Sequence, residues 1–258
     1  MNGKADEGAA AFFDLDGTLV APPSLERRFV KELWRQGVLG WREAVAWLRE
    51  ALRLLPAGSF AVRHGNKKHL GGISSRAAEQ FRVSREWFFE EGLEQVLRHA
   101  KEGDAIVFVS GTLEPLAALA AREVEGWLAE RGTPAAIQVI ATRLESESGR
   151  WTGRILGEPM AGEAKRRAVR RVVAEMAIRS GRCYAYGNTE DDLWMLEATG
   201  HPCAVNPARR MERLAREAGW RILRWDGRGG ERFRKLEVTA SSGMRNAENP
   251  RQRWELSR

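Results

Sequence analysis

Two aspartates separated by one residue close the first apolar run of the chain, and their type and spacing suit metal chemistry. The run ends at Phe13, and Asp14 and Asp16 come next, followed by Gly17. In a strand, side chains two positions apart share a face, so both carboxylates are expected together at the strand's carboxyl end. Carboxylates this close repel each other unless a cation or a proton lies with them. The pair therefore indicates a hard divalent cation, with an Asx-rich turn as the alternative.

Polar residues of the same kind follow later apolar runs. Ser110 and Gly111 end the second predicted strand, and Asn188 ends the fourth, with Asp192 one helical turn further on. Lys165 lies between them at the start of a predicted helix. In a doubly wound sheet such strand ends converge on one crevice. Carboxylates, a hydroxyl with free N–H groups and a lysine are together suited to phosphate and magnesium.

The elements that must position these residues alternate between strand and helix patterns. Unbroken apolar runs predict strands that are buried on both faces. Their alternation with helices predicts an α/β fold with a parallel, doubly wound sheet and helices on both faces. The strands are expected at 9–14, 105–109, 136–140, 183–186, 201–205 and 220–225, with a small hairpin over 143–155.

A long insert of helical character separates the first strand from the second. Helices are expected there at 24–34, 41–55 and 84–100. The middle helix carries an apolar stripe that we expect to be buried against its neighbours above the site. The stripe consists of Trp41, Val45, Leu48 and Leu52.

This pattern divides the chain into three parts. Residues 1–20 and 101–225 are expected to form the core domain, and residues 21–100 a helical cap domain. Residues 226–258 are rich in Gly, Arg, Ser, Asn and Glu, and this composition predicts a basic, mostly disordered tail.

Composition and cysteine usage indicate a globular protein of the cytoplasm. Of its 258 residues, 43% are apolar and 30% are charged, which suits one core or a core with a smaller insert. No apolar run approaches the ~20 residues that cross a bilayer, and no secretory segment is evident. The two cysteines, Cys183 and Cys203, lie in strand-like runs, so we expect buried thiols in a reducing compartment.

A net charge of +7 could serve nucleic acid, an anionic membrane or small anionic substrates. The arginines are spread through the helices and the tail, which favours a solvated basic surface. We therefore expect no nucleic-acid partner and a small phosphorylated substrate. The sequence leaves the oligomeric state undetermined.

The four motifs in this order resemble those of the haloacid dehalogenase (HAD) superfamily of phosphotransferases. The resemblance covers roughly residues 9–225, and the helical insert is similar to the cap of subfamily IB, the phosphoserine-phosphatase-like branch. The motifs are Phe13-Asp14-Leu15-Asp16-Gly17-Thr18-Leu19, Val109-Ser110-Gly111-Thr112, Lys165 in Gly162-Glu163-Ala164-Lys165, and Gly187-Asn188-Thr189-Glu190-Asp191-Asp192.

The resemblance implies a phosphomonoester hydrolase that works through an aspartyl-phosphate. Asp14 would be the nucleophile, and Asp16 would protonate the leaving group and then activate water. Ser110 and the Gly111 N–H would hold phosphate oxygens, while Lys165 would neutralise charge on the nucleophile and the phosphoryl group. From the residues alone, Ser110 could instead be a helix cap, and Lys165 could belong to a solvated basic helix face.

The same resemblance implies Mg2+ as cofactor. Its ligands would be Asp14, the Asp16 carbonyl and Asn188, with Asp192 as a further ligand. The family usually has Asp at position 188, so the neutral amide removes one negative charge from the site. Asp192 would then have to compensate, or metal affinity would fall.

Specificity is expected to come from the cap. Phosphoserine phosphatases carry an acid nine residues after the nucleophile, and this chain has Pro23 there. The difference disfavours phosphoserine as the substrate. Candidate cap contacts to the substrate are Arg63, Asn66 and Lys67.

Two other functions stay open at the level of sequence. The Trp-, Arg- and Leu-rich insert would suit an enzyme or binding module for lipid phosphates at a membrane surface, although mutual burial of its apolar stripes is favoured. The neutral Asn188 would suit a weakly active phosphate-binding protein.

Overall fold

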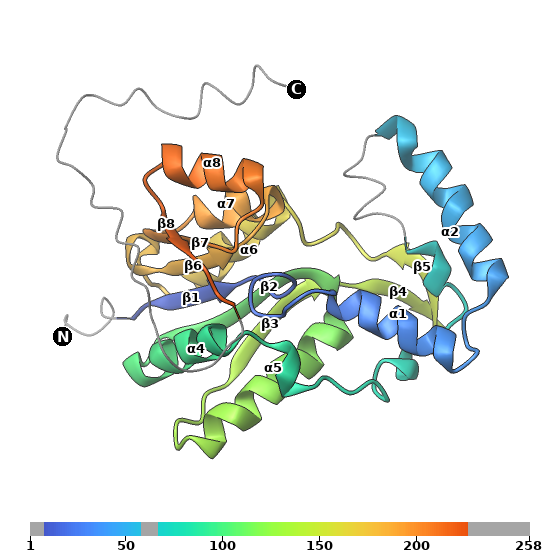
Figure 1. Cartoon of the computed structure of the whole chain (residues 1–258), viewed down its shortest axis with the longest axis horizontal. Coiled ribbons are helices and arrows are strands. Elements are labelled where there is room, and N and C mark those ends of the chain that lie inside the picture. Colours follow the sequence, from blue (N-terminus) through green and yellow to red (C-terminus); the bar gives the residue numbers. More distant parts are fainter. Residues whose placement is uncertain (1–7, 58–66, 227–258) are drawn as a thin grey trace.

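A six-stranded parallel sheet forms the centre of the computed structural model, which describes residues 8–57 and 67–226 (Figure 1). The strand order is β3-β2-β1-β6-β7-β8. The predicted α/β class and doubly wound arrangement are confirmed. The strands are β1 (Ala10–Phe13), β2 (Ala105–Leu113), β3 (Ile137–Thr142), β6 (Tyr184–Gly187), β7 (His201–Val205) and β8 (Arg221–Leu223).

Helices cover both faces of this sheet because side chains alternate along each strand. Phe13 points into a core shared with α4 and α5, whereas Phe12 points into a second core shared with α6, α7 and α8. Neither side of β1 reaches solvent, which accounts for its unbroken apolar sequence. The flanking helices are α4 (Glu90–Glu102), α5 (Glu114–Glu130), α6 (Glu163–Glu175), α7 (Leu193–Leu196) and α8 (Arg209–Glu217).

The remaining elements lie together beyond one end of the sheet (Figure 1). They are α1 (Leu25–Arg35), α2 (Trp41–Leu54) and the hairpin of β4 (Leu144–Glu147) and β5 (Arg150–Ile155). The hairpin joins the insert through a bridge between Ser74 and Arg150 and through the Gly72 N–H, which donates to the Trp151 carbonyl. The insert therefore packs on a hairpin from the second half of the chain.

The helix expected at 84–100 begins later than the sequence indicates. Residues 85–87 form a short 3-10 turn, and α4 begins only at Glu90. The backbone between these elements is extended because it bonds to the segment after β1: the Ala21 N–H donates to the Trp87 carbonyl, and the Phe89 N–H donates to the Leu19 carbonyl. Non-local hydrogen bonds here override a helical pattern. The helix itself packs against the sheet, although it was assigned to the insert.

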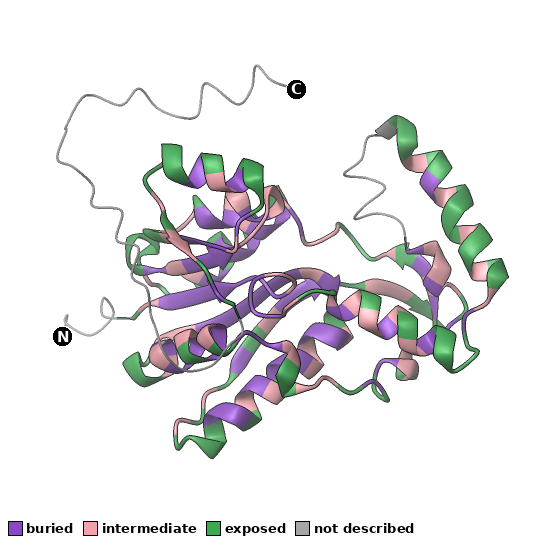
Figure 2. Ribbon diagram, viewed as in Figure 1, coloured by how far each residue is buried: buried purple, intermediate pink, exposed green. Residues whose placement is uncertain are grey.

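The expectation that the apolar stripe of α2 is buried is wrong. Trp41, Leu48 and Leu52 are exposed to 71%, 53% and 58% of their surface, and Figure 2 shows α2 largely exposed along its length. Only Ala51 of this helix is buried among the residues that the structure describes. The helix is amphipathic in pattern, but its apolar face is largely exposed among the described elements.

Several predictions fall outside the described part of the chain. Arg63, Asn66 and the tail from residue 227 onward lie there. The division into core, cap and tail stays a prediction. Both cysteines are free and buried, as expected. In the described residues, every helix is too short or too polar to span a bilayer.

A buried histidine ties α4 to the sheet beneath the site. His99 Nδ1 donates to Asp104 Oδ2 at 2.7 Å, and its Nε2 accepts from the Tyr186 hydroxyl at 2.8 Å. Tyr186 in turn stacks on Phe13, with ring centroids 4.5 Å apart. Burial lowers the pKa of His99, and Asp104 opposes this shift without reversing it. The fold therefore selects the neutral imidazole.

This shift predicts a pH dependence of stability. A folded-state pKa below the unfolded value means that protonation favours unfolding, so stability is lost as pH falls below ~6.5. The free energy of unfolding should fall less between about pH 7.5 and pH 5.5 in His99→Gln than in the unaltered chain. Denaturant titrations at both pH values test this, with exposed His201→Gln as the control. Equal losses in the two chains would contradict the prediction.

Candidate active site

The carboxyl end of β1 lies at the bottom of a cavity of about 780 Å³. Asp14 begins where the strand stops, and its N–H donates to the Tyr186 carbonyl at 2.9 Å, which fixes the backbone beside β6. Asp16, Ser110, Gly111, Lys165, Asn188 and Asp192 line the same cavity. The structure thus brings together all the core residues that the sequence singled out.

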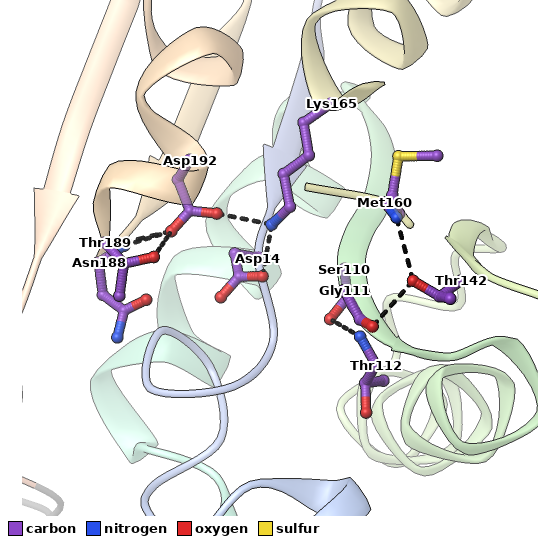
Figure 3. Close-up of polar contacts among 10 residues, drawn as sticks. All are labelled: Asp14, Ser110, Gly111, Thr112, Thr142, Met160, Lys165, Asn188, Thr189 and Asp192. Atoms are coloured by element: carbon purple, nitrogen blue, oxygen red, sulfur yellow. Dashed lines mark hydrogen bonds and ion pairs between the residues drawn. The ribbon is translucent and has the colours of Figure 1, made fainter. Parts of the chain in front are cut away.

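Lys165 bridges two carboxylates at the centre of this site (Figure 3). Its Nζ lies 2.7 Å from Asp14 Oδ1 and 2.6 Å from Asp192 Oδ1. All three residues are almost fully buried. Lys165 is therefore not part of a solvated basic face, even though arginines surround it in sequence. Its place in the first turn of α6 directs the ammonium into the cavity.

The second oxygen of Asp192 is also occupied. Oδ2 accepts the N–H groups of Asn188 and Thr189, each at 3.0 Å, and the Thr189 hydroxyl at 3.2 Å. Asp192 thus closes the loop that follows β6 and holds Asn188 in place. Both oxygens of Asp192 are therefore engaged by neighbouring groups of the site.

Two glycines allow these loops to approach each other closely. A Cβ on Gly17, whose φ is +85°, would lie 2.2 Å from Asn188 Nδ2. A Cβ on Gly187 would lie 2.5 Å from the Asp192 Cβ. The side chain of Asn188 therefore lies directly against the loop that carries Asp16.

The buried charges perturb each other. Burial, reinforced by the charge of Asp192, raises the pKa of Asp14 to about 7, although Lys165 opposes the rise. Burial alone would lower the pKa of Lys165, but the two carboxylates outweigh burial and raise it. The lysine is therefore charged, and it is the group that favours ionisation of Asp14.

Asp16 is held differently from Asp14. Its Oδ1 accepts the Leu25 N–H at 2.8 Å, at the amino-terminus of α1. Burial raises the pKa of Asp16 to about 6, and the Leu25 N–H counteracts part of the rise. A carboxyl group with this pKa can exchange protons near neutral pH. The two aspartates of the first motif are thus chemically unequal.

Ser110 and Gly111 lie in an irregular part of β2, which continues past the predicted end to Leu113. The Thr112 N–H donates to Ser110 Oγ at 3.3 Å. The Thr142 hydroxyl donates to the Gly111 carbonyl at 2.8 Å and accepts the Met160 N–H at 3.0 Å (Figure 3). Thr142 was not singled out from the sequence; a polar residue ending the apolar run of β3 was its only signal.

The insert supplies the opposite wall of the cavity. Lys67, a predicted cap contact, is buried and pairs with Glu26 in the first turn of α1, with Nζ 2.6 Å from Oε1. Glu26 lies one helical turn after Pro23, so an acid is present in the cavity after all, but it is paired. Sequence reasoning missed Glu26, His69, Trp34 and Trp47 as cavity residues. Glu26 and Trp34 share α1, whereas Trp47 lies on α2 and His69 in a short 3-10 turn, so no single spacing links all four.

The donor set fits a hard cation. Lys165 bonds to Asp14 Oδ1, and Oδ2 makes no hydrogen bond within the described residues. Figure 3 shows this second oxygen on the side of Asp14 that faces Asn188. A carboxylate oxygen and an amide oxygen on adjacent strand ends are the oxygen donors that Mg2+ prefers. Asp14 and Asn188 could hold such an ion without displacing Lys165.

The haloacid dehalogenase-like hydrolase family model matches residues 11–197. The chain belongs to this family. The match spans every core motif of the cavity, from Asp14 on β1 to Asp192 after β6. Relatives of the chain that are named for an activity are phosphatases. This HAD hydrolase is a phosphatase as well.

Three similar proteins place the HAD hydrolase among its relatives. "Phosphoserine phosphatase SerB1" of Mycobacterium tuberculosis is 31% identical over 229 residues, which cover 84% of this chain and 71% of the relative. "Histidinol-phosphatase" of Neisseria meningitidis is 27% identical, with 83% and 97% covered. A solved structure of a protein of unknown function from Bordetella pertussis is 27% identical with a TM-score of 0.66, covering 84% of this chain and 98% of the other.

The close approach at Gly17 gives a testable prediction for this HAD hydrolase. Gly17→Ala should cost about 1 kcal/mol of stability through its positive φ and should also displace the Asn188 amide. Gly219→Ala is the matched control, because Gly219 has a φ of +68° and no neighbour within 4 Å of a new Cβ. Phosphatase activity should fall in the first variant alone. Equal activities in variants of equal stability would contradict a role for Asn188.

Proposed function

We propose that this phosphatase hydrolyses a small phosphomonoester through a covalent aspartyl-phosphate on Asp14. The observation that carries the proposal is the asymmetric environment of this carboxylate. One oxygen bonds to Lys165 at 2.7 Å, and the other makes no hydrogen bond within the described residues. Lys165 favours the ionised form of Asp14 against the effect of burial, and that form is the one a nucleophile requires.

The proposed reaction has two displacements. A carboxylate oxygen of Asp14 attacks phosphorus while the bond to the leaving oxygen breaks, and Asp16 gives that oxygen a proton. Asp16 then takes a proton from water, whose oxygen attacks the same phosphorus and releases Asp14 and inorganic phosphate. The oxygen of Asp16 that does not bond to Leu25 would carry this proton. A pKa of about 6 supports the exchange at neutral pH.

Other residues of the cavity would bind the phosphate. We assign phosphate oxygens to the Ser110 hydroxyl and the Gly111 N–H, with the Thr142 bond to the Gly111 carbonyl fixing that peptide. Asp14, the Asp16 carbonyl and Asn188 would hold Mg2+. When bound, the ion would offset the negative charge of phosphate and nucleophile. Asp192 would position Lys165 and Asn188, in place of the ligand role suggested by sequence.

The cap wall bears on the substrate. The names of the relatives refer to different substrates. In the sequence, Glu26 is the acidic residue nearest to Pro23. Its carboxylate is already paired with Lys67, which disfavours an ammonium group of phosphoserine as its partner. We therefore propose a small phosphorylated metabolite other than phosphoserine. The buried free thiols favour a cytoplasmic setting.

The role of Asp14 is tested by Asp14→Asn. The amide keeps an oxygen for Lys165 and leaves the backbone bond to Tyr186 in place, so the fold should persist. Hydrolysis of p-nitrophenyl phosphate should fall by roughly three orders of magnitude or more. Circular dichroism and thermal unfolding check the fold. Undiminished turnover in a folded variant would exclude Asp14 as the nucleophile.

Asn188 favours a second candidate, a phosphate-binding protein with weak turnover, because its amide removes a negative charge from the metal site. Asn188→Asp restores that charge and should lower the Mg2+ concentration for half-maximal activity by roughly tenfold. Exposed Gln138→Glu is the matched control. An unchanged Mg2+ requirement would argue against ligation by residue 188. Efficient Mg2+-dependent turnover of the unaltered chain would remove the second candidate.

A further inference from the structure

The exposed apolar stripe of α2 does not line the cavity. We define the outer stripe as Trp41, Val45, Leu48 and Leu52. Successive residues of a helix turn by 100°, so these four positions share one face. Each is at least 36% exposed, and Trp41 reaches 71%. A row of large apolar side chains on one helix of a globular protein calls for a partner.

A row of arginines runs beside the stripe. Arg42, Arg49 and Arg53 follow one another along the same edge of α2, and all three are exposed. Both acidic residues of the helix, Glu43 and Glu50, lie on the opposite side and are partly buried. Glu50 reaches Arg53 from that side, with Oε2 3.5 Å from Nη1, so the outward half of α2 is apolar and cationic with the charge of Arg53 partly offset.

We propose that the outer stripe of α2 docks on an anionic lipid surface. An amphipathic helix with Trp and Leu on one face and arginines along its edge can lie in the headgroup region with its apolar face buried. Tryptophan rings favour that depth, and the arginines gain from negative lipid headgroups. The charge of the arginine row complements such a surface along the whole helix.

A second copy of the chain fits this face less well. A 14-residue helix is about 21 Å long, and one row of side chains covers a few hundred Å², short of the ~800 Å² per partner of a stable interface. An antiparallel pairing would also set one arginine row against the other. Lipid phosphates relieve that repulsion, whereas a second copy adds to it.

The same helix also borders the cavity. Trp47, on another side of α2, lines the cavity together with Trp34 of α1, and both are exposed by more than 40%. Figure 1 shows α2 as the outermost helix at that end of the molecule. Docking through the outer stripe would therefore bring the cavity wall next to the lipid surface.

Vesicle co-sedimentation of the full chain tests the proposal without any phosphate ester, so its result is independent of the proposed function. The vesicles contain equal amounts of phosphatidylcholine and phosphatidylglycerol, with pure phosphatidylcholine for comparison. The unaltered chain should sediment with the anionic vesicles, and added salt should weaken binding. The double variant Leu48→Glu, Leu52→Glu should lose at least about tenfold in partitioning.

The matched control places the same change elsewhere on the surface. Leu156 and Met176 are exposed to 50% and 42%, so the double variant Leu156→Glu, Met176→Glu alters charge equally. This control should bind as the unaltered chain does. Thermal unfolding confirms that each variant is folded. The double variant Arg42→Gln, Arg49→Gln introduces no charge into the stripe, and it should also bind the anionic vesicles more weakly.

Three results would overturn the proposal: no binding of the unaltered chain to anionic vesicles, binding that survives in Leu48→Glu, Leu52→Glu, or equal loss in the control. Light scattering after size-exclusion chromatography tests whether a second copy of the chain occupies the stripe instead. A stable dimer that this variant dissociates would show that the stripe is an interface between copies of the chain, and would equally overturn lipid docking.

Discussion

The site depends on one buried ammonium group. Lys165 lies between Asp14 and Asp192, and without it two carboxylates would share a buried pocket without compensation. Breaking such a cluster at one member is costly because the remaining charges stay buried. The lysine also bonds to only one Asp14 oxygen, so the interaction that stabilises the pocket also makes the two oxygens of Asp14 unequal.

The sheet topology is what allows this cluster to form. β1 occupies the middle of the sheet, with β2 on one side and β6 on the other, so the three polar strand ends lie side by side although more than 170 residues separate the first from the last. Gly17 and Gly187 then let the loops approach at distances that no side chain would permit. Rigid backbone contacts, rather than long side chains, fix the spacing of the donors.

The insert contributes in a different way, because its surfaces face both inward and outward. Inward, the pair of Glu26 and Lys67 lies in a cavity lining that also includes Arg27 and Lys31, so the insert gives the cavity a polar wall with a net positive charge. Outward, α2 leaves an apolar stripe uncovered, which its amphipathic pattern alone does not foretell. A periodic apolar stripe indicates that the two faces of a helix differ in polarity, but it does not indicate which face packs on the rest of the protein. Burial of that stripe was therefore the interpretation that failed.

The sequence by itself determined the parallel α/β fold, the order of the motifs and the membership of the core site, since strand ends and apolar runs are local signals. Tertiary structure alone decided what bonds to what. It joined Asp192 to the Lys165 ammonium and to the Asn188 N–H, and it brought the Thr142 hydroxyl to the Gly111 carbonyl. It also replaced the start of a predicted helix with a short 3-10 turn and extended backbone. It supplied Glu26 in the cavity, where Pro23 had suggested that no acid would be found. Each of these depends on contacts between residues distant in sequence, whose partners no local pattern encodes.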